Sequence, residues 1–420
     1  RFPRTCYAGD RTGHEMISTL VDRLHGTGVR IENEVTVISL LQEGQRVSGA
    51  IGLDRQGAIR VMLADATILA TGGGTRIYDI STNSSSGTGD GYAIGYNAGA
   101  ELIDMEQIQF HPTGAVYPYD ARGRLVTEAV RGEGGLLKNV EGERFMKRYD
   151  PERMELSTRD VVARAIATEI LEGKGTKNGG VYLDVTHLPR SQIESRLPVM
   201  LEQFLKFGID IRDVPMEVAP TAHHIMGGLR ITTMGETTLP CLYACGEVSG
   251  GVHGANRLGG NALAETQVFG KRAGEAAGRV KERKKAADQK MIEDAEQRIS
   301  SFNQGDVAPS AIVRSLQTTM WEGAGIFRNG PDLQKTLGII RHLQTLNPKA
   351  ASPANFAECC ILQNMLTTAS LVVRSALLRK ESRGAHLRRD ISQNWDPEHS
   401  PYGHTYLSLS REGIETRAVK

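Results

Sequence analysis

Residues 66–74 read ATILATGGG, an apolar run that ends in one threonine and three glycines. A buried strand followed by a glycine turn is how nucleotide-binding α/β sheets present backbone amides to a ligand. A second glycine-rich stretch, GTGDG at residues 87–91, opens a predicted helix over residues 92–98. Further β-type runs separated by turn residues precede the first stretch, at residues 35–40, 47–53 and 59–63. This order predicts an α/β domain that binds a nucleotide.

The length of 420 residues suggests two or three domains. Residues 107–222 are more charged and richer in arginine, which indicates a separate inserted domain. Because strand-like runs return near residue 218, we expect residues 1–106 and 223–275 to form the α/β domain together. Residues 276–420 are predicted to form a helical C-terminal domain and tail.

Two helix starts are marked by their residues. Thr12 and Glu15 have the spacing of a capping box, ahead of apolar residues that share one helical face. Ser352 precedes Pro353 as a cap followed by proline, and this helix is predicted to stop at Gly384. Residues 1–10 are typical of an interior loop, so we expect the protein to extend upstream of them.

Composition excludes several classes of protein. The net charge of +1 gives no reason to expect nucleic acid, and the basic run at residues 281–285 is interpreted as an exposed helix face. Five cysteines in a chain this long do not make a disulfide framework, so we expect small buried residues in a reducing compartment. No stretch approaches a membrane span of about 18 apolar residues. The start of an HExxH zinc motif at His14 fails at Ser18, so no metal site is predicted.

Polar, glycine-rich segments carry the candidate chemistry. They supply arginine, histidine and threonine side chains beside glycines that let a ligand approach the backbone. Arginine binds a carboxylate through two parallel hydrogen bonds, so such a site suits a small dianion. The segments are FHPTG (110–114), LVTEAVRGEGG (125–135), TRD (158–160), PTAHHIMGG (220–228) and GEVSGGVHGANRLGGNAL (246–263).

These segments, with ESRGAH at residues 381–386, resemble in sequence and order the signature segments of the succinate dehydrogenase and fumarate reductase flavoprotein family. L-aspartate oxidase is a sister family with most of the same segments. The resemblance implies an α/β, Rossmann-like FAD-binding domain with an inserted α+β capping domain over residues 107–222. It also implies hydride transfer between FAD and fumarate or succinate. The family's first strand, with its G-x-G-x-x-G turn, does not open this chain, so we expect a fragment; a separate polypeptide or a degenerate remnant are the alternatives.

The resemblance also implies roles for individual residues. Arg159 would be the proton donor to fumarate or the acceptor from succinate. Glu128 and Arg131, three apart and thus neighbours on a helical turn, would complete its proton relay. The substrate carboxylates would be held by His111, Thr127, His223 and Arg257.

FAD would be bound by residues near both glycine turns and at a predicted helix start. The positive end of a helix that begins at Asn261 would stabilise the anionic reduced flavin. The implied residues are Thr71, Gly72, Gly73, Asp90, Glu247, Asn261, Ala262 and Leu263.

Other polar residues of these segments have more than one interpretation. His224 is expected to be a packed neighbour of His223, and His253 either orients its loop or touches substrate. Arg383 and His386 are interpreted as structural or close to FAD.

The predicted function is interconversion of fumarate and succinate, in which electrons are exchanged with an iron–sulfur partner protein. Such a protein would be cytoplasmic, with attachment to the cytoplasmic membrane face through its partners. L-aspartate oxidase and a non-catalytic FAD-family remnant remain the alternatives.

Overall fold

The computed structural model describes residues 6–8, 11–281, 288–392, 405–410 and 413–418. The chain divides into two compact units. Unit 1 comprises Arg1–Ile31, Ile80–Thr82 and Phe110–His223, and unit 2 comprises the rest. The inserted segment therefore lies within a few residues of its predicted bounds, 107–222. Residues 1–31 differ from the prediction, because they group with the insert.

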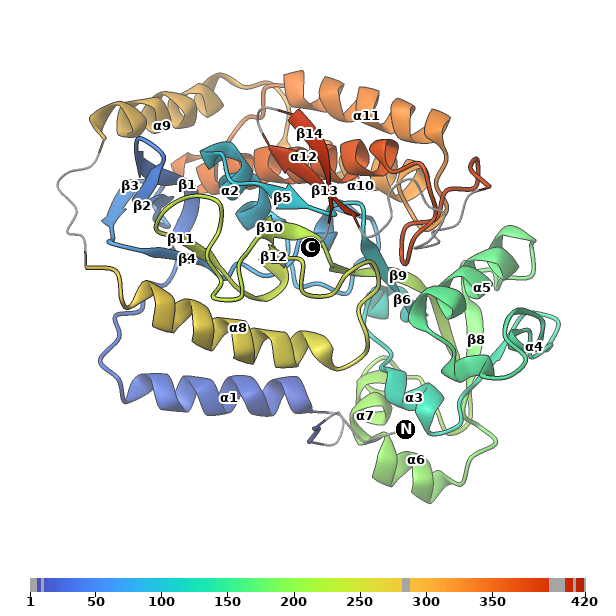
Figure 1. Ribbon diagram of the computed structural model, residues 1–420. Helices are drawn as coiled ribbons and strands as arrows, with labels where there is room; N and C mark the ends of the chain where they lie inside the picture. Colours follow the sequence, from blue (N-terminus) through green and yellow to red (C-terminus); the bar gives the residue numbers. More distant parts are fainter. Residues whose placement is uncertain (1–5, 9–10, 282–287, 393–404, 411–412, 419–420) are drawn as a thin grey trace. The chain divides into compact units, whose positions relative to one another are not determined.

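Unit 1 is an α+β domain built on one sheet. Its four strands lie in the order β6 (Ile108–Tyr117), β9 (Met216–Ile225), β8 (Val181–Asp184) and β7 (Leu136–Lys138). Strands β7, β8 and β9 pair antiparallel. Short helices lie beside the sheet in Figure 1: α3 (Glu128–Gly132), α4 (Met146–Tyr149), α5 (Arg159–Leu171), α6 (Arg190–Arg196) and α7 (Pro198–Leu205). Val162, Ile166 and Phe204 from these helices pack against Val181 and Val218 of the sheet to form the core.

The first helix, α1 (Thr12–His25), has no buried residue. Ile17 and Leu20 on its predicted apolar face are 65% and 51% exposed. The predicted capping box is wrong: Arg11 holds the cap position, and Thr12 instead accepts a hydrogen bond from Ala8 N at 3.0 Å.

Unit 2 contains the glycine turns that the sequence predicted. Strands β4 (Thr67–Leu69) and β11 (Leu242–Ala244) pair in parallel, and α8 (Asn261–Ala277) packs on them through Ala273 and Tyr243 (Figure 1). Each strand runs into a glycine with positive φ, Gly72 (+74°) and Gly246 (+72°). An antiparallel sheet is formed by β1 (Thr36–Glu43), β2 (Arg46–Leu53) and β3 (Ile59–Leu63).

Helices α9 (Gln289–Ser301), α10 (Pro309–Gly323), α11 (Gly330–Thr345) and α12 (Phe356–Leu378) form the predicted helical part of unit 2. Ser352 holds the cap position of a short 3₁₀ turn, Pro353–Asn355, that leads into α12, but its hydroxyl donates to Asn355 Oδ1 (2.8 Å) instead of capping a backbone N–H. The helix ends at Leu378, earlier than predicted, because residues 379–386 turn back into a buried polar network. Within the described residues, one helical segment, Pro353–Leu378, is by length and composition apolar enough to cross a membrane, which the sequence interpretation missed. Of its apolar 18-residue stretch, 67% is buried inside the protein, as in the core helix of a soluble protein.

The end of the described chain differs from the predicted helical tail. Strands β13 (Thr405–Ser410) and β14 (Gly413–Ala418) form a hairpin that joins a second sheet of unit 2. This sheet has the order β12 (Ser249–Gly250), β10 (Gly228–Arg230), β5 (Leu102–Ile103), β13, β14. Strand pairing overrides local composition here.

The cysteines only partly match their predicted burial. Cys245, Cys359 and Cys360 are buried, Cys241 is half-buried, and Cys6 is exposed. Residues 282–287, which hold most of the basic run, lie outside the described residues.

Candidate functional site

Two helix starts in unit 1 bring the predicted proton donor to its predicted relay. Helix α3 begins at Glu128 and helix α5 begins at Arg159, each after a threonine in extended conformation. Arg159 donates hydrogen bonds from Nε (3.0 Å) and Nη2 (2.8 Å) to the same oxygen, Glu128 Oε2. Its side chain is 15% exposed, while that of Glu128 is 52% exposed. The Glu128 carboxylate therefore contacts solvent on one side and the Arg159 guanidinium on its other side.

Arg131, one helical turn after Glu128, is buried. Its Nη1 donates to Glu155 O at 2.6 Å, whereas its Nε and Nη2 have no hydrogen-bond partner among the described residues. Burial lowers the pKa of Arg131, the nearby charge of Arg159 lowers it further, and Glu128 opposes both effects. The three predicted catalytic residues thus form one electrostatic cluster within unit 1.

His111 and His223 also come together in unit 1. Their ring centroids are 5.2 Å apart in an edge arrangement. His111 Nδ1 accepts a hydrogen bond from Thr113 N at 3.3 Å, which assigns the proton to Nε2. The pKa of His111 lies well below its usual value, because the ring is buried and has His223, Arg159 and Arg131 nearby. His111 therefore offers a neutral N–H donor. His223 Nδ1 shares a hydrogen bond of 2.7 Å with Thr82 Oγ1.

Thr127, the residue before α3, has a buried hydroxyl that lacks a partner in the described part of the chain. An unsatisfied buried donor or acceptor costs about 1–3 kcal/mol. A ligand carboxylate at this position would satisfy Thr127 Oγ1. The fourth predicted anchor, Arg257, belongs to unit 2, where it is buried and bonded to Gln109.

The predicted FAD residues all lie in unit 2. Glu247 Oε1 accepts from Ile225 N at 3.0 Å, and Oε2 lies 3.1 Å from His224 Nδ1. A Cβ on Gly73 would lie 2.0 Å from Glu247 Oε1, so a side chain at this turn would displace the Glu247 carboxylate. Asp90 accepts from Thr88 Oγ1 and from Asn364 Nδ2 (2.7 Å), which ties the start of α2 (Asp90–Ala98) to α12.

Helix α8 begins as predicted, at Asn261, after Gly260 in the left-handed region at φ +82°. Leu263 in its first turn is 39% exposed. The buried Nε2 of His224 has no partner within the described residues. A glycine turn, a helix start and an unsatisfied ring nitrogen on one unit fit a flavin dinucleotide.

His224 and His253 are each paired to a carboxylate. His253 Nε2 lies 2.9 Å from Glu265 Oε2, and the two imidazole centroids are 5.4 Å apart. Burial lowers the pKa of His224, and Glu247 partly offsets this. Sequence interpretation missed Glu265 and Gln109, because neither lies in a pattern typical of a site.

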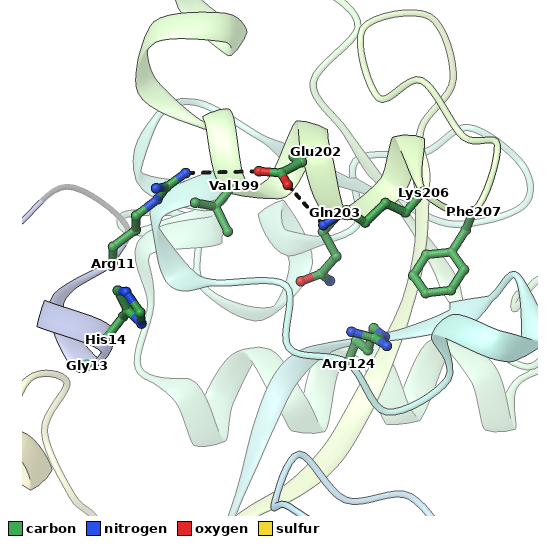
Figure 2. A pocket seen from close by; sticks show the side chains of 9 residues that line it. All are labelled: Arg11, Gly13, His14, Arg124, Val199, Glu202, Gln203, Lys206 and Phe207. Carbon is green, nitrogen blue, oxygen red and sulfur yellow. Dashed lines mark ion pairs between the residues drawn. The ribbon is translucent and has the colours of Figure 1, made fainter. Parts of the chain in front are cut away.

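A pocket of about 780 Å³ in unit 1 is separate from all predicted site residues (Figure 2). Glu202 at its edge pairs with Arg11 (4.0 Å) and Lys206 (2.9 Å). The guanidinium of Arg124 lies over the Phe207 ring at 5.1 Å. Arg11, Glu202 and Lys206 pair with one another and are exposed, so this pocket indicates no particular ligand.

Two family models match the chain: the FAD binding domain over residues 1–263 and the fumarate reductase flavoprotein C-terminal domain over residues 313–419. One of the subunits of the fumarate reductase (CoM/CoB) of Methanothermobacter marburgensis is 52% identical, over 98% of this chain and 76% of its own length. L-aspartate oxidase 1 of Ralstonia nicotianae is 38% identical, over 94% of this chain and 74% of its own. A quinol fumarate reductase variant of Escherichia coli superposes with a TM-score of 0.91 at 33% identity, covering 100% of this chain and 77% of that one.

The chain therefore belongs to the fumarate reductase and succinate dehydrogenase flavoprotein family. It is an oxidoreductase with FAD as its cofactor, and its fold is that of the fumarate reductase flavoprotein. These points confirm the predicted family, fold class, enzyme class and cofactor. The roles of individual site residues stay predictions.

Proposed function

We propose that this protein interconverts fumarate and succinate, with Arg159 as the proton donor and acceptor. The observation that carries the proposal is the double hydrogen bond from Arg159 to Glu128, with buried Arg131 one helical turn away. An arginine acts as an acid only if its proton is replaced at once, and a half-exposed carboxylate beside it provides that replacement.

Reduction of fumarate adds two electrons and two protons across its double bond. Reduced FAD, when bound, would supply the hydride, from its N5, to one of the two central carbons. Arg159 delivers a proton to the other carbon, and Glu128 and Arg131 return a proton to Arg159. His111, Thr127, His223 and Arg257 hold the two carboxylates, and oxidation of succinate runs the same steps in reverse. For FAD, the contributing residues are those of the glycine turns and of the α8 start, Thr71, Gly72, Gly73, Asp90, Glu247, Asn261, Ala262 and Leu263.

The electrons pass to or from an iron–sulfur subunit in this proposal. The Methanothermobacter relative is named as one of the subunits of its enzyme, which supports a complex of several chains. A cytoplasmic location, with attachment to the membrane face through partner subunits, follows from the same proposal. Copurification of a native complex, followed by iron analysis of the second subunit, tests it.

Oxidation of L-aspartate is the second candidate, because an L-aspartate oxidase matches the chain at 38% identity. The two reactions use the same carboxylate anchors, so turnover decides between them. Succinate- or fumarate-dependent turnover without aspartate oxidation supports the first proposal, and aspartate oxidation alone overturns it.

A further inference from the structure

Gln109 holds Arg257 from two directions. Its Oε1 accepts a hydrogen bond from Arg257 Nη2 at 2.8 Å, and its Nε2 donates to the backbone oxygen of Arg257 at 2.9 Å. Nε2 also lies 3.2 Å from Asn256 Oδ1. Gln109 is 1% exposed and Arg257 is 7% exposed. One amide thus fixes both the guanidinium and the loop that carries it.

The same loop is held on another side by the ESRGAH segment. Arg383 and His386 form a one-bridge hairpin, from which Ala385 N donates to Ala255 O at 2.9 Å. At the tip, Gly384 has φ +55°, and a Cβ there would lie 2.2 Å from Ala255 O. The segment therefore has a structural role here, as backing for residues 255–257.

We propose that Gln109 is a positioning residue that orients Arg257 for one carboxylate of the substrate. This inference rests on the proposed function, in which Arg257 is a dicarboxylate anchor. A guanidinium binds a carboxylate with two parallel hydrogen bonds only in a defined plane. The bond from Nη2 to Gln109 fixes that plane before the substrate arrives, so binding does not have to order the side chain.

Gln109→Met removes the amide and keeps a similar volume, and Gln107→Met is its matched control. Gln107 is also 1% exposed in unit 2, and its amide bonds to Glu106 (3.2 Å) instead of to Arg257. Succinate affinity would be measured by titration calorimetry on the FAD-loaded protein, with flavin content and melting temperature recorded for each variant. We expect Gln109→Met to weaken succinate binding about 10- to 100-fold, the effect of losing a hydrogen bond to a charged group. Gln107→Met should leave succinate affinity within about 2-fold.

A double-mutant cycle with Arg257→Ala separates positioning from general structural damage. If Gln109 acts through Arg257, Gln109→Met adds no more than about 2-fold once Arg257 is alanine. Full additivity, or unchanged affinity in Gln109→Met, overturns the inference while leaving the proposed function standing. Wild-type protein that binds FAD but no dicarboxylate would overturn both.

Discussion

Replacing Arg159 with lysine tests the proton transfer while keeping the positive charge. Arg159 reaches Glu128 Oε2 through two nitrogens, at 3.0 and 2.8 Å. A lysine presents one nitrogen on a different stem and cannot make both bonds. The carboxylate anchors remain, and so does the positive charge near His111.

The expected loss follows from the role of the group. A positioned general acid contributes about 10²–10⁴-fold, equivalent to roughly 3–5 kcal/mol of activation free energy. We therefore expect the kcat for fumarate reduction to fall by at least about 100-fold in Arg159→Lys. The Kd for succinate should change by less than about 3-fold, because transition-state stabilisation is lost and ground-state binding is not.

The assay is fumarate-dependent oxidation of a reduced viologen dye by the FAD-loaded enzyme, with succinate affinity measured separately. Arg190→Lys is the control, since Arg190 is an exposed guanidinium of the same unit that pairs with Asp213. Turnover of Arg159→Lys within about 3-fold of wild type would refute the role of Arg159 as proton donor. Loss of succinate affinity with unchanged kcat would show it to be a binding residue.

Three further predictions concern the relay, the flavin turn and acid stability. Glu128→Gln removes the carboxylate that returns a proton to Arg159, so the kcat for fumarate reduction should fall about 100-fold while succinate affinity is retained. An unchanged kcat would exclude Glu128 from the relay. Gly73→Ala places a Cβ 2.0 Å from Glu247 Oε1 and so displaces a carboxylate predicted to bind FAD, which should lower the flavin-to-protein ratio after reconstitution. The control Gly270→Ala, which has open space around its Cβ, should bind flavin fully. Burial lowers the pKa of His111, His224 and His386 below 6.5. Below about pH 6.5 the unfolded chain therefore binds protons that the folded state does not. As the pH is lowered through this range, the free energy of unfolding should decrease by about 1.4 kcal/mol per pH unit for each histidine. Between about pH 8 and about pH 5, the melting temperature should depend less steeply on pH in His386→Gln than in His187→Gln, a substitution of an exposed histidine. Equal pH dependence in the two variants would contradict a lowered pKa for His386.

Local sequence patterns predicted the strand and helix positions that depend on interactions between residues close together in the chain. The strand β3 (Ile59–Leu63) has its predicted bounds, and α8 begins at the predicted Asn261. Where sequence failed, contacts distant in the chain decided the outcome. The helix α12 stops at Leu378 because Arg379 enters a buried ion-pair network with Glu106, 273 residues away. The terminal hairpin pairs with β5, about 300 residues earlier in the chain, which no local pattern indicates.

The candidate site shows the same division. Short motifs indicated His111 and His223, and the structure brings their rings to 5.2 Å although 112 residues separate them. The structure also pairs Arg159 with Glu128, while their roles in a proton relay stay predictions. Gln109 escaped notice because an uncharged amide in an apolar strand has no signature until its partner, Arg257, is seen beside it.

The most direct test of the account is fumarate-dependent oxidation of reduced viologen by the full-length protein loaded with FAD, with L-aspartate oxidation measured in parallel. We predict dye oxidation that requires fumarate and that yields one succinate for every two electrons taken up. Bound flavin with no fumarate-dependent oxidation, alongside turnover of L-aspartate, would contradict it.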